Sequence, residues 1–580
     1  MNRVDHAVIG GLVLVLAVIA AVVGLPAIVP TSATPSASVP SLPPVVPYRE
    51  GTLGRPVSVN PLAARTQVDR DLVALTFDGL VRLGPDGMLV PDLASHWTTD
   101  ETGKTWTFTL RADARWHDGQ PVTAADVAFT VDVLRDAAYT GPGAGSWREV
   151  TATVIDEQTI RFDLATPLGG FLQLATQPIA PAHLLSGIPV DALATDPFGH
   201  DPVGSGPFAI VELDDDHATL EPAADSAPPP QDPVGPGVGS AKPPGDALVT
   251  PSPTKRPSVA QPRISRFEFR FFDDQESLES AFRAGEIDAV SGLAPAAAAA
   301  LAADPGTRTI RYPGTTLTAV ALNLRPDHPE LRDPAVRRAL LAAIDRGALI
   351  ANAYGGLAAQ ANSPIPSTSW AFDPAASAPV AYDAGAAGKA LAKAGWKKVD
   401  DHWRPPGAKD PYTLELLAPP ADSNPTLRAA AERIAADWTA LGLTVALTDA
   451  DPATLLTDHL QPGTFSAAIV DVSIGHDPDL YPLLASSQTQ TGGLNVIGLQ
   501  DATLDGLLIA ARRPGTDEAR KAAYTALETQ LTANQYVLPI AFADEVVVVK
   551  SDVQDVVPQP VGDPSDRFWD VLTWRLANDR

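Results

Sequence analysis

The chain has 580 residues, enough to bury several hydrophobic cores, so we expect two or three domains. It carries 42 Lys and Arg against 69 Asp and Glu, a net charge of −27 that repels phosphate backbones and argues against a nucleic-acid partner. It contains no cysteine, which excludes disulfides, thiolate zinc sites and cysteine nucleophiles.

The N-terminus begins with an uncharged stretch, AVIGGLVLVLAVIAAVVGL, from Ala7 to Leu25. In a helix it would span roughly 28 Å, close to the thickness of the hydrocarbon core of a bilayer. We expect one N-terminal transmembrane helix within residues 1–30, with a cleaved signal as the alternative. Residues 31–47, rich in Pro and Ser, would form a stiff tether to an extracytoplasmic domain.

The rest of the chain alternates strand and helix patterns. Residues 105–111 and 159–165 alternate apolar and polar side chains, which predicts strands. Helical spacing runs from Pro425 to Gly442 behind a capping Asn424, and the same pattern covers 331–350 behind a capping Asp333. This order predicts an α/β fold.

The stretch RWHDGQP, from Arg115 to Pro121, raises the question of a catalytic His117–Asp118 pair. Thr123 and Asp126 follow as a capping-box pattern, and Gly119 can supply the positive φ of a sharp connection. We therefore interpret the stretch as a turn that leads from a strand into a helix.

A second stretch of low complexity runs from Glu221 to Pro262 and is rich in Pro and Gly. We expect a disordered insertion in a surface loop, because proline removes hydrogen-bond donors and few side chains here could be buried. The flanking sequences PFAIVEL and RISRFEFRFF both look like strands. The insertion should therefore decorate a hairpin-like connection and not a domain boundary.

Several segments in order carry a resemblance to a known family. The region Phe77–Leu134, the glycine-rich Pro202–Phe208, the strand and helix Ala321–Ile350 and the element Asp477–Tyr481 resemble the family 5 extracellular solute-binding proteins. These are the oligopeptide-, dipeptide- and nickel-binding receptors of ABC importers. The resemblance covers residues 48–580 apart from the proline-rich insertion.

The resemblance implies a two-lobed, periplasmic-binding-protein-like α/β fold of type II with three sub-domains. A receptor of this kind captures a peptide-like or other small solute by lobe closure and delivers it to the membrane permease without bond chemistry. We expect a monomer with no cofactor and no metal. The implied parts are lobe I (48–84, 200–320 and 545–580, with the insertion 221–262), a small inserted sub-domain (85–199) and lobe II (321–544).

The resemblance also points to candidate residues for binding the solute. Peptide-binding relatives often place a tryptophan six residues, and an aspartate three residues, before the first Asp of the Asp-Pro-Asp element. Asp471 and Ile474 occupy those positions here, so the usual carboxylate partner for a peptide ammonium is missing. We hypothesise that Asp471 contacts a cationic group instead; the alternative is a strand-end aspartate held by backbone amides.

Four further residues are candidates, each with a structural alternative. Asp477 could contact the solute or cap a helix, and His476 beside it could face the cleft or solvent. Asn323 could bond the solute or the backbone. Trp370 could stack on the solute or pack within the protein.

Other classes of function are less well supported by the sequence. No Walker loop, G-x-S-x-G or H-E-x-x-H motif occurs, and the 10 histidines lack metal-ligand spacing. A hydrolase with dispersed catalytic residues remains the enzymatic alternative. A sensor of the same fold that signals without transport remains the other.

Overall fold

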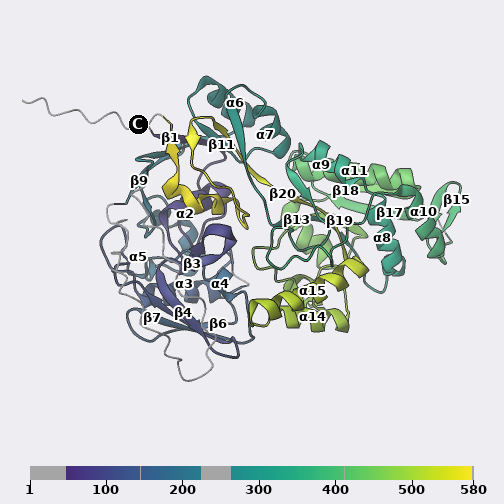
Figure 1. The fold of residues 1–580 in the computed structure, drawn as a ribbon, viewed down its shortest axis with the longest axis horizontal. Coiled ribbons are helices and arrows are strands. Elements are labelled where there is room, and N and C mark those ends of the chain that lie inside the picture. The colour runs from purple at the N-terminus through teal and green to yellow at the C-terminus, as the bar shows by residue number, and fades with distance from the viewer. Residues whose placement is uncertain (1–46, 144–145, 224–262, 410–411, 491, 578–580) are drawn as a thin grey trace, which may run out of the picture. The chain divides into compact units, whose positions relative to one another are not determined.

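The computed structural model describes residues 47–143, 146–223, 263–409, 412–490 and 492–577, and residues from Val46 onward form one compact unit (Figure 1). The expected transmembrane helix in residues 1–30, nearly all of the tether and most of the insertion lie outside these residues. No helix within the described ranges is long and apolar enough to cross a membrane.

The first of three main sheets has seven strands in the order β12-β21-β11-β1-β10-β9-β8. β1 runs parallel to β10 and β11, and the other pairs are antiparallel. Helices α2 (Gln67–Thr76), α6 (Gln275–Ala284) and α7 (Pro295–Leu301) belong to this region. Its strands are β1 (Tyr48–Leu53), β8 (Phe208–Leu213), β9 (His217–Pro222), β10 (Phe267–Phe272), β11 (Ala289–Ser291), β12 (Thr307–Tyr312) and β21 (Glu545–Lys550).

The second sheet has six strands in the order β14-β20-β13-β19-β17-β18, and a separate hairpin, β15 (Lys397–Val399) and β16 (His402–Arg404), belongs to the same part of the chain. Its strands are β13 (Thr316–Leu322), β14 (Ala358–Gln360), β17 (Thr413–Ala418), β18 (Thr444–Asp449), β19 (Ala467–Ser473) and β20 (Val537–Ala543). The accompanying helices are α8 (Pro334–Ala342), α9 (Arg346–Ala353), α10 (Ala384–Lys393), α11 (Pro425–Leu441), α13 (Tyr481–Leu484), α14 (Ala502–Arg512) and α15 (Asp517–Asn534).

The third sheet, β4-β5-β7-β6, is antiparallel and packs on an aromatic cluster that includes Trp147, Phe162 and Phe171. The alternation seen in the sequence is confirmed, because β5 buries every second side chain. Its elements are β4 (Ala94–Thr99), β5 (Thr105–Leu110), α3 (Ala124–Arg135), β6 (Val150–Val154), β7 (Thr159–Leu164), α4 (Phe171–Leu174) and α5 (Ala182–Leu185), and a short hairpin, β2 (Val81–Leu83) and β3 (Leu89–Pro91), precedes it.

The chain passes between the seven- and six-stranded sheets at two adjacent places. Tyr312 pairs with Glu545 in the first sheet, and Leu317 pairs with Phe542 in the second. The linking segments, 313–315 and Asp544, therefore run side by side. The first passage comes before the expected lobe boundary at residues 320 and 321, because β13 already belongs to the six-stranded sheet.

The capping residues in the sequence predicted both ends of α11 correctly, but only the start of α8. α11 begins after Asn424, whose side chain accepts from the Leu427 N–H, and ends at Gly442 with φ of 105°. α8 starts behind Asp333 as predicted but ends at Ala342. Asp345 then accepts from the Ala348 N–H and starts a new helix, α9, so the single pattern over 331–350 is two helices.

The insertion begins later than predicted. β9 extends through Pro222, so Glu221 and Pro222 are strand residues, and the sequence missed this strand between the two flanking ones. β9 and β10 are antiparallel neighbours, with Leu220 opposite Phe267. The connection is hairpin-like, as expected, but it joins β9 to β10 and not β8 to β10.

The RWHDGQP stretch is the predicted turn. Asp118 accepts from the Gln120 N–H at 3.0 Å, and Gly119 has φ of 86°. Thr123 and Asp126 form the capping box of α3. No nucleophile is joined to this pair in the described contacts, so the dyad interpretation is not supported.

Candidate functional site

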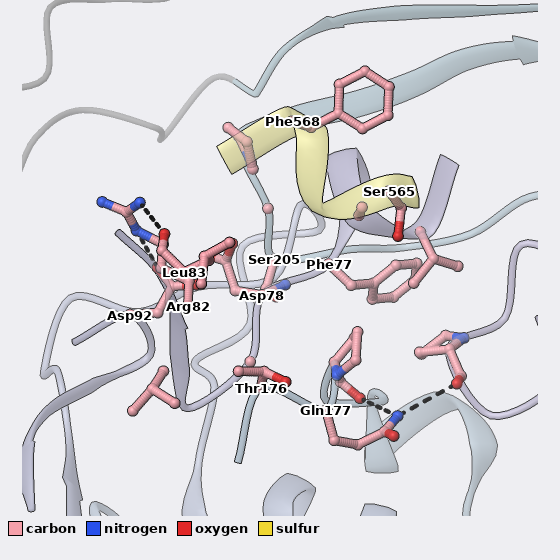
Figure 2. A pocket seen from close by; sticks show the side chains of 18 of the residues that line it. Phe77, Asp78, Arg82, Leu83, Asp92, Thr176, Gln177, Ser205, Ser565 and Phe568 are labelled. Carbon is pink, nitrogen blue, oxygen red and sulfur yellow. Dashed lines mark hydrogen bonds and ion pairs between the residues drawn. The ribbon is translucent and has the colours of Figure 1, made fainter. Parts of the chain in front are cut away.

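A cavity of about 720 Å³ lies where α2, the four-stranded-sheet region and the 3-10 helix η7 (Pro564–Thr573) meet. This size is typical of small-molecule sites, roughly 300–1,000 Å³. In Figure 2, Gln177 lies below Phe77, and η7 crosses above them. Aromatic side chains contribute much of the lining: Phe77, Trp116, Trp147, Phe568 and Trp569.

The glycine-rich loop around Ser205 forms one wall, and its glycines are needed for close backbone contact. The N–H groups of Ser205 and Gly206 donate to the Thr76 carbonyl at 3.0 and 2.8 Å. A Cβ on Gly204 would lie 1.9 Å from that carbonyl oxygen, so no other residue fits there. Ser205 Oγ accepts from the Asp78 N–H at 3.1 Å, which holds the end of α2 against the cavity.

His117 ties the turn after β5 to this loop. Its N–H donates to the Gly204 carbonyl at 2.7 Å, and its Nε2 lies 3.0 Å from the Gly206 carbonyl. Because a carbonyl can only accept, Nε2 must carry the ring proton. Burial lowers the pKa of His117, so the ring is neutral at pH 7 and its role is to position the wall.

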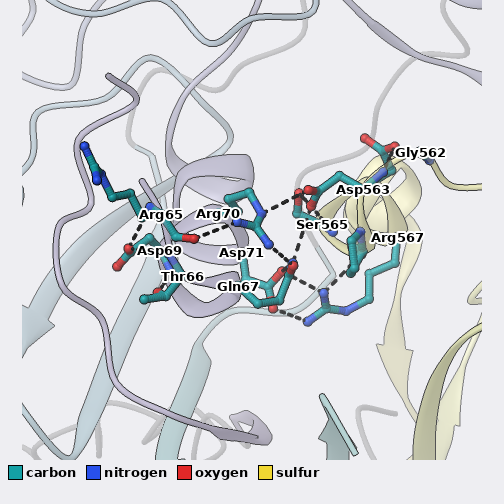
Figure 3. Close-up of polar contacts among 12 residues, drawn as sticks. Arg65, Thr66, Gln67, Asp69, Arg70, Asp71, Gly562, Asp563, Ser565 and Arg567 are labelled. Carbon is teal, nitrogen blue, oxygen red and sulfur yellow. Dashed lines mark hydrogen bonds and ion pairs between the residues drawn. The ribbon is translucent and has the colours of Figure 1, made fainter. Parts of the chain in front are cut away.

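The opposite wall is held by the network of Figure 3. Arg567 of η7 donates to both carboxylate oxygens of Asp71 at 2.8 and 2.7 Å and to Glu50 at 2.7 Å, and all three side chains are buried. Arg70 contacts Asp563 at 2.9 Å beside the cavity. These contacts join β1, α2 and η7, which are far apart in the sequence.

Several of the charges that line the cavity are paired. Arg70 pairs with Asp563, and Arg82 lies 3.6 Å from Asp92. Glu221 pairs with Arg266 at 2.6 Å. The chamber therefore offers aromatic faces, hydrogen-bonding groups and charged side chains, among them Arg111, Asp113 and Arg115, which suits the binding of a small polar solute.

His476 is the only one of the six predicted residues that lines this cavity. It follows β19 of the six-stranded sheet, and its Nε2 lies 3.4 Å from Asp566 of η7. The side chain is mostly buried. His476 therefore connects the six-stranded-sheet part of the chain to the cavity wall.

Asp477 does not cap a helix, because α13 begins only at Tyr481 and is preceded by Leu480. Its carboxylate accepts twice from Arg520 Nη2, at 2.9 and 2.7 Å, and from the Tyr524 hydroxyl at 3.3 Å. The sequence pattern Asp-Pro was misleading because its partner lies on α15, far along the chain.

Trp370 joins the same cluster. Arg520 lies over its ring at 4.5 Å, and Tyr524 packs edge-on at 5.1 Å. Part of the indole, 38% of the residue, remains exposed. The structure thus brings Trp370 and Asp477 together through α15.

Asp471 lies on β19 at a position that solvent reaches, but neighbouring protein atoms shield much of its carboxylate from water. Its Oδ1 accepts from Thr318 Oγ1 at 2.6 Å, and Thr318 in turn lies 2.7 Å from the Tyr354 hydroxyl. This desolvation of the carboxylate raises the pKa of Asp471. No cation pairs with it in the described ranges, and no backbone amide there donates to it, contrary to the structural alternative.

Ile474 and Asn323 lie in the interior. Ile474 is buried in the core of the six-stranded-sheet region, and its N–H donates to the Thr315 carbonyl. Asn323 is fully buried and donates to the carbonyls of Gly463 and Phe465 at 3.0 and 2.9 Å. Its backbone-bonding alternative accounts for these hydrogen bonds.

One cluster in the described residues has the composition of a metal site: Glu212, Asp214 and His217 on the β8–β9 hairpin. His217 Nε2 contacts Glu212 at 3.3 Å and its Nδ1 contacts Asp214 at 3.0 Å. Each carboxylate thus contacts a different nitrogen of the ring, and all three residues lie at the surface. We treat the cluster as surface ion pairs.

The sequence reasoning missed most of the cavity. Phe77, Trp116, Gln177 and Ser565 come from four separate stretches that only the fold brings together. Two signals were available, the turn RWHDGQP and the loop PVGSGPF, because both carried the family resemblance and both contribute to the wall.

Comparison with known proteins agrees with this geometry. Residues 88–493 match the family described as bacterial extracellular solute-binding proteins, family 5. Protein XP55 of Streptomyces lividans is 27% identical over 91% of this chain and 86% of its own length. A putative ABC transporter peptide-binding protein of Brucella melitensis is 26% identical over 83% of this chain and 85% of its own. The ABC transporter substrate-binding protein CtaP of Listeria monocytogenes shares the fold, with a TM-score of 0.72 and 22% identity over 92% of this chain and 99% of its own.

Fold and cavity together define a two-lobed α/β binding protein that is not an enzyme. The chain belongs to the family 5 bacterial extracellular solute-binding proteins, because the family match covers well over half of its length. The hydrolase alternative is therefore set aside.

Proposed function

We propose that this protein is the extracytoplasmic substrate-binding protein of an ABC importer and that the 720 Å³ cavity is where it holds a peptide-like or other small solute. The observation that carries the proposal is the composition of the cavity wall. It combines α2, the four-stranded-sheet region and η7 with His476, which follows β19 of the six-stranded sheet, so a solute there can contact both large parts of the protein.

The seven- and six-stranded sheets would be the cores of lobes I and II, with the four-stranded sheet as the inserted sub-domain. Two adjacent passages, 313–315 and Asp544, join the large sheets, an arrangement suited to hinge motion. A solute that contacts both lobes favours the closed form by its difference in affinity for the two states. The membrane permease would recognise that form.

Residues 1–30, outside the described ranges, would serve as a membrane anchor or a signal, and the protein would act as a monomer. An anchor would keep the receptor close to its permease and raise its effective concentration.

Native mass spectrometry of the purified protein, alone and after incubation with a mixture of short peptides and sugars, tests the proposal. We expect a retained small solute or saturable binding of one class, without turnover. Chemical conversion of the solute, or no binding of any class, would contradict it.

For the solute's charge, we propose that Asp471, which lies on β19 outside the cavity wall, contacts a cationic group of the solute when the lobes close. Its free carboxylate oxygen and raised pKa suit a partner that brings its own positive charge. Asp471→Asn should weaken binding of a cationic solute about tenfold or more by calorimetry, since charge-assisted hydrogen bonds contribute about 1.5–3 kcal/mol. Asp422→Asn, at an exposed aspartate, is the matched control, and equal affinities in both variants would refute the role.

A further inference from the structure

Lysine is concentrated in one part of this acidic protein. Five of its ten lysines fall within residues 389–409, on α10, the β15–β16 hairpin and the loop after it. Together with Arg338 of α8 they give a region where cations gather. Figure 1 shows α8, α10 and β15 close together at one end of the six-stranded-sheet region. Arg404 of β16 adds a further cation, and we call Arg338, Lys389, Lys393, Lys397 and Arg404 the basic face.

Several residues of the basic face lie close to a residue of the same charge, which is electrostatically unfavourable. Lys389 and Lys393 are four residues apart on α10, where like charges destabilise a helix. Lys397 lies directly opposite Arg404 in the hairpin, an unfavourable cross-strand pair. Arg338 and Lys393 line the same groove between α8 and α10.

No carboxylate forms an ion pair with the basic face within the described ranges, although Asp333 lines the same groove and Asp400 and Asp401 form the turn of the hairpin. None of the five residues takes part in an ion pair there, whereas Arg55, Arg283 and Arg428 each contact two carboxylates. The neighbouring acids Asp333 and Asp383 accept from the N–H groups at the starts of α8 and α10. A chain with 27 excess negative charges thus has one surface on which five cations lack an ion-pair partner among the described residues.

The residue types indicate what the basic face would contact. Protein interfaces are enriched in Arg and aromatic residues and depleted in Lys. Here three of the five residues are lysines whose ammonium groups form no ion pair in the described ranges, and α10 otherwise presents only Ala and Gly with a single large buried side chain, Leu391. Lysine side chains are flexible and carry their charge at one point, so they can adjust to mobile phosphate groups. A helix with few large side chains offers little shape for a protein partner to recognise.

We infer that the basic face docks on the anionic phospholipid headgroups of a membrane and orients the protein there. The remaining surface, rich in Asp and Glu, is repelled by the same headgroups, so the attraction is confined to this end. The inference goes beyond solute capture and does not depend on which solute is bound.

Vesicle co-sedimentation of the full chain tests this inference. Vesicles of phosphatidylcholine alone are compared with vesicles that contain one-third phosphatidylglycerol; the apolar N-terminal stretch can associate with both, so the ratio isolates the charge effect. We expect the parent protein to favour the anionic vesicles by about fivefold or more at low salt, with the ratio falling as salt screens the attraction.

The combined variant Lys389→Gln, Lys393→Gln, Lys397→Gln should bring this ratio close to one. The matched control Lys104→Gln, Arg148→Gln, Arg513→Gln changes the net charge equally at exposed positions elsewhere and should keep the parent's ratio. The basic-face variant should also melt at or above the parent's temperature at low salt, because repulsion is removed, and its solute affinity should be unchanged.

A parent protein without preference for anionic vesicles would overturn the inference. So would equal losses in the two variants, or a basic-face variant that melts below the parent at low salt. Concentration-dependent self-association that disappears in the basic-face variant would assign the surface to a second copy of the chain, which also overturns membrane docking. None of these outcomes bears on solute capture, which is measured separately.

Discussion

Two buried arginines show that the two large sheet regions stabilise an interior positive charge in different ways. Arg567, beside the seven-stranded sheet, is bound by the carboxylates of Asp71 and Glu50. Arg346, beside the six-stranded sheet, is equally buried but donates only to the carbonyls of Ala361, Pro539 and Val380.

The difference appears in the pKa of each guanidinium. Burial alone would lower the pKa of Arg567, but attraction to Asp71 and Glu50 outweighs it and the pKa is raised. Burial lowers the pKa of Arg346 to about 10, since no carboxylate offsets it. The first arrangement depends on charge balance between a cation and two carboxylates, whereas the second depends on the dipoles of backbone carbonyls.

The largest loss of stability is expected when Arg567 is removed from its two carboxylate partners. Arg567→Met leaves Glu50 and Asp71 buried without their cation and should reduce the free energy of unfolding by about 3–5 kcal/mol in urea at pH 7. Adding Glu50→Gln and Asp71→Asn to the same chain should recover most of the loss. If the single variant unfolds at the parent's urea concentration, the carboxylates are not dependent on Arg567.

A smaller loss is expected from Arg346→Met, because no charge is left behind. Three carbonyl oxygens lose a donor, which corresponds to about 1–3 kcal/mol in the same urea experiment. A loss as large as that of Arg567→Met would show that carbonyl dipoles and carboxylates hold a buried guanidinium equally well, against the comparison made above.

The smallest effect depends on pH and belongs to the first region only. Burial raises the pKa of Glu545, near Arg567 and Asp71, to about 7. The folded state therefore keeps a proton that the unfolded state has released, and this contribution to stability is lost as pH rises from about 4.5 to 7.

Glu545→Gln should accordingly stabilise the protein by about 1–2 kcal/mol at pH 8 and not at pH 4, measured by thermal or urea unfolding. The effect of Arg346→Met should be the same at both pH values, since its pKa lies above this range. A gain from Glu545→Gln that does not change with pH would point to packing as its cause.

Local signals in the sequence predicted local structure well. The caps of α11 and α3 and the turn at His117 follow from a few neighbouring residues, and all three are confirmed. The break between α8 and α9 was missed because the apolar spacing continues across it, and the capping role of Asp345 becomes clear only from its hydrogen bond to Ala348.

The candidate site was harder to predict because its contacts are long-range. Asp477 was interpreted from its neighbour Pro478, but its carboxylate binds Arg520 on α15. Ile474 was placed by alignment to a family pattern, yet its side chain packs in the core. His476 reaches the cavity only because η7, close to the C-terminus, folds back beside it.

The pairing of Leu220 with Phe267 has a practical consequence for engineering a biosensor. The stretch between them leaves and re-enters the sheet at neighbouring positions, so exchanging it for a folded module whose ends lie close together would not pull the two strands apart. Because the entropy of closing a connection grows only slowly with its length, a fluorescent protein placed there should be tolerated. Such a chimera would convert solute capture into an optical signal.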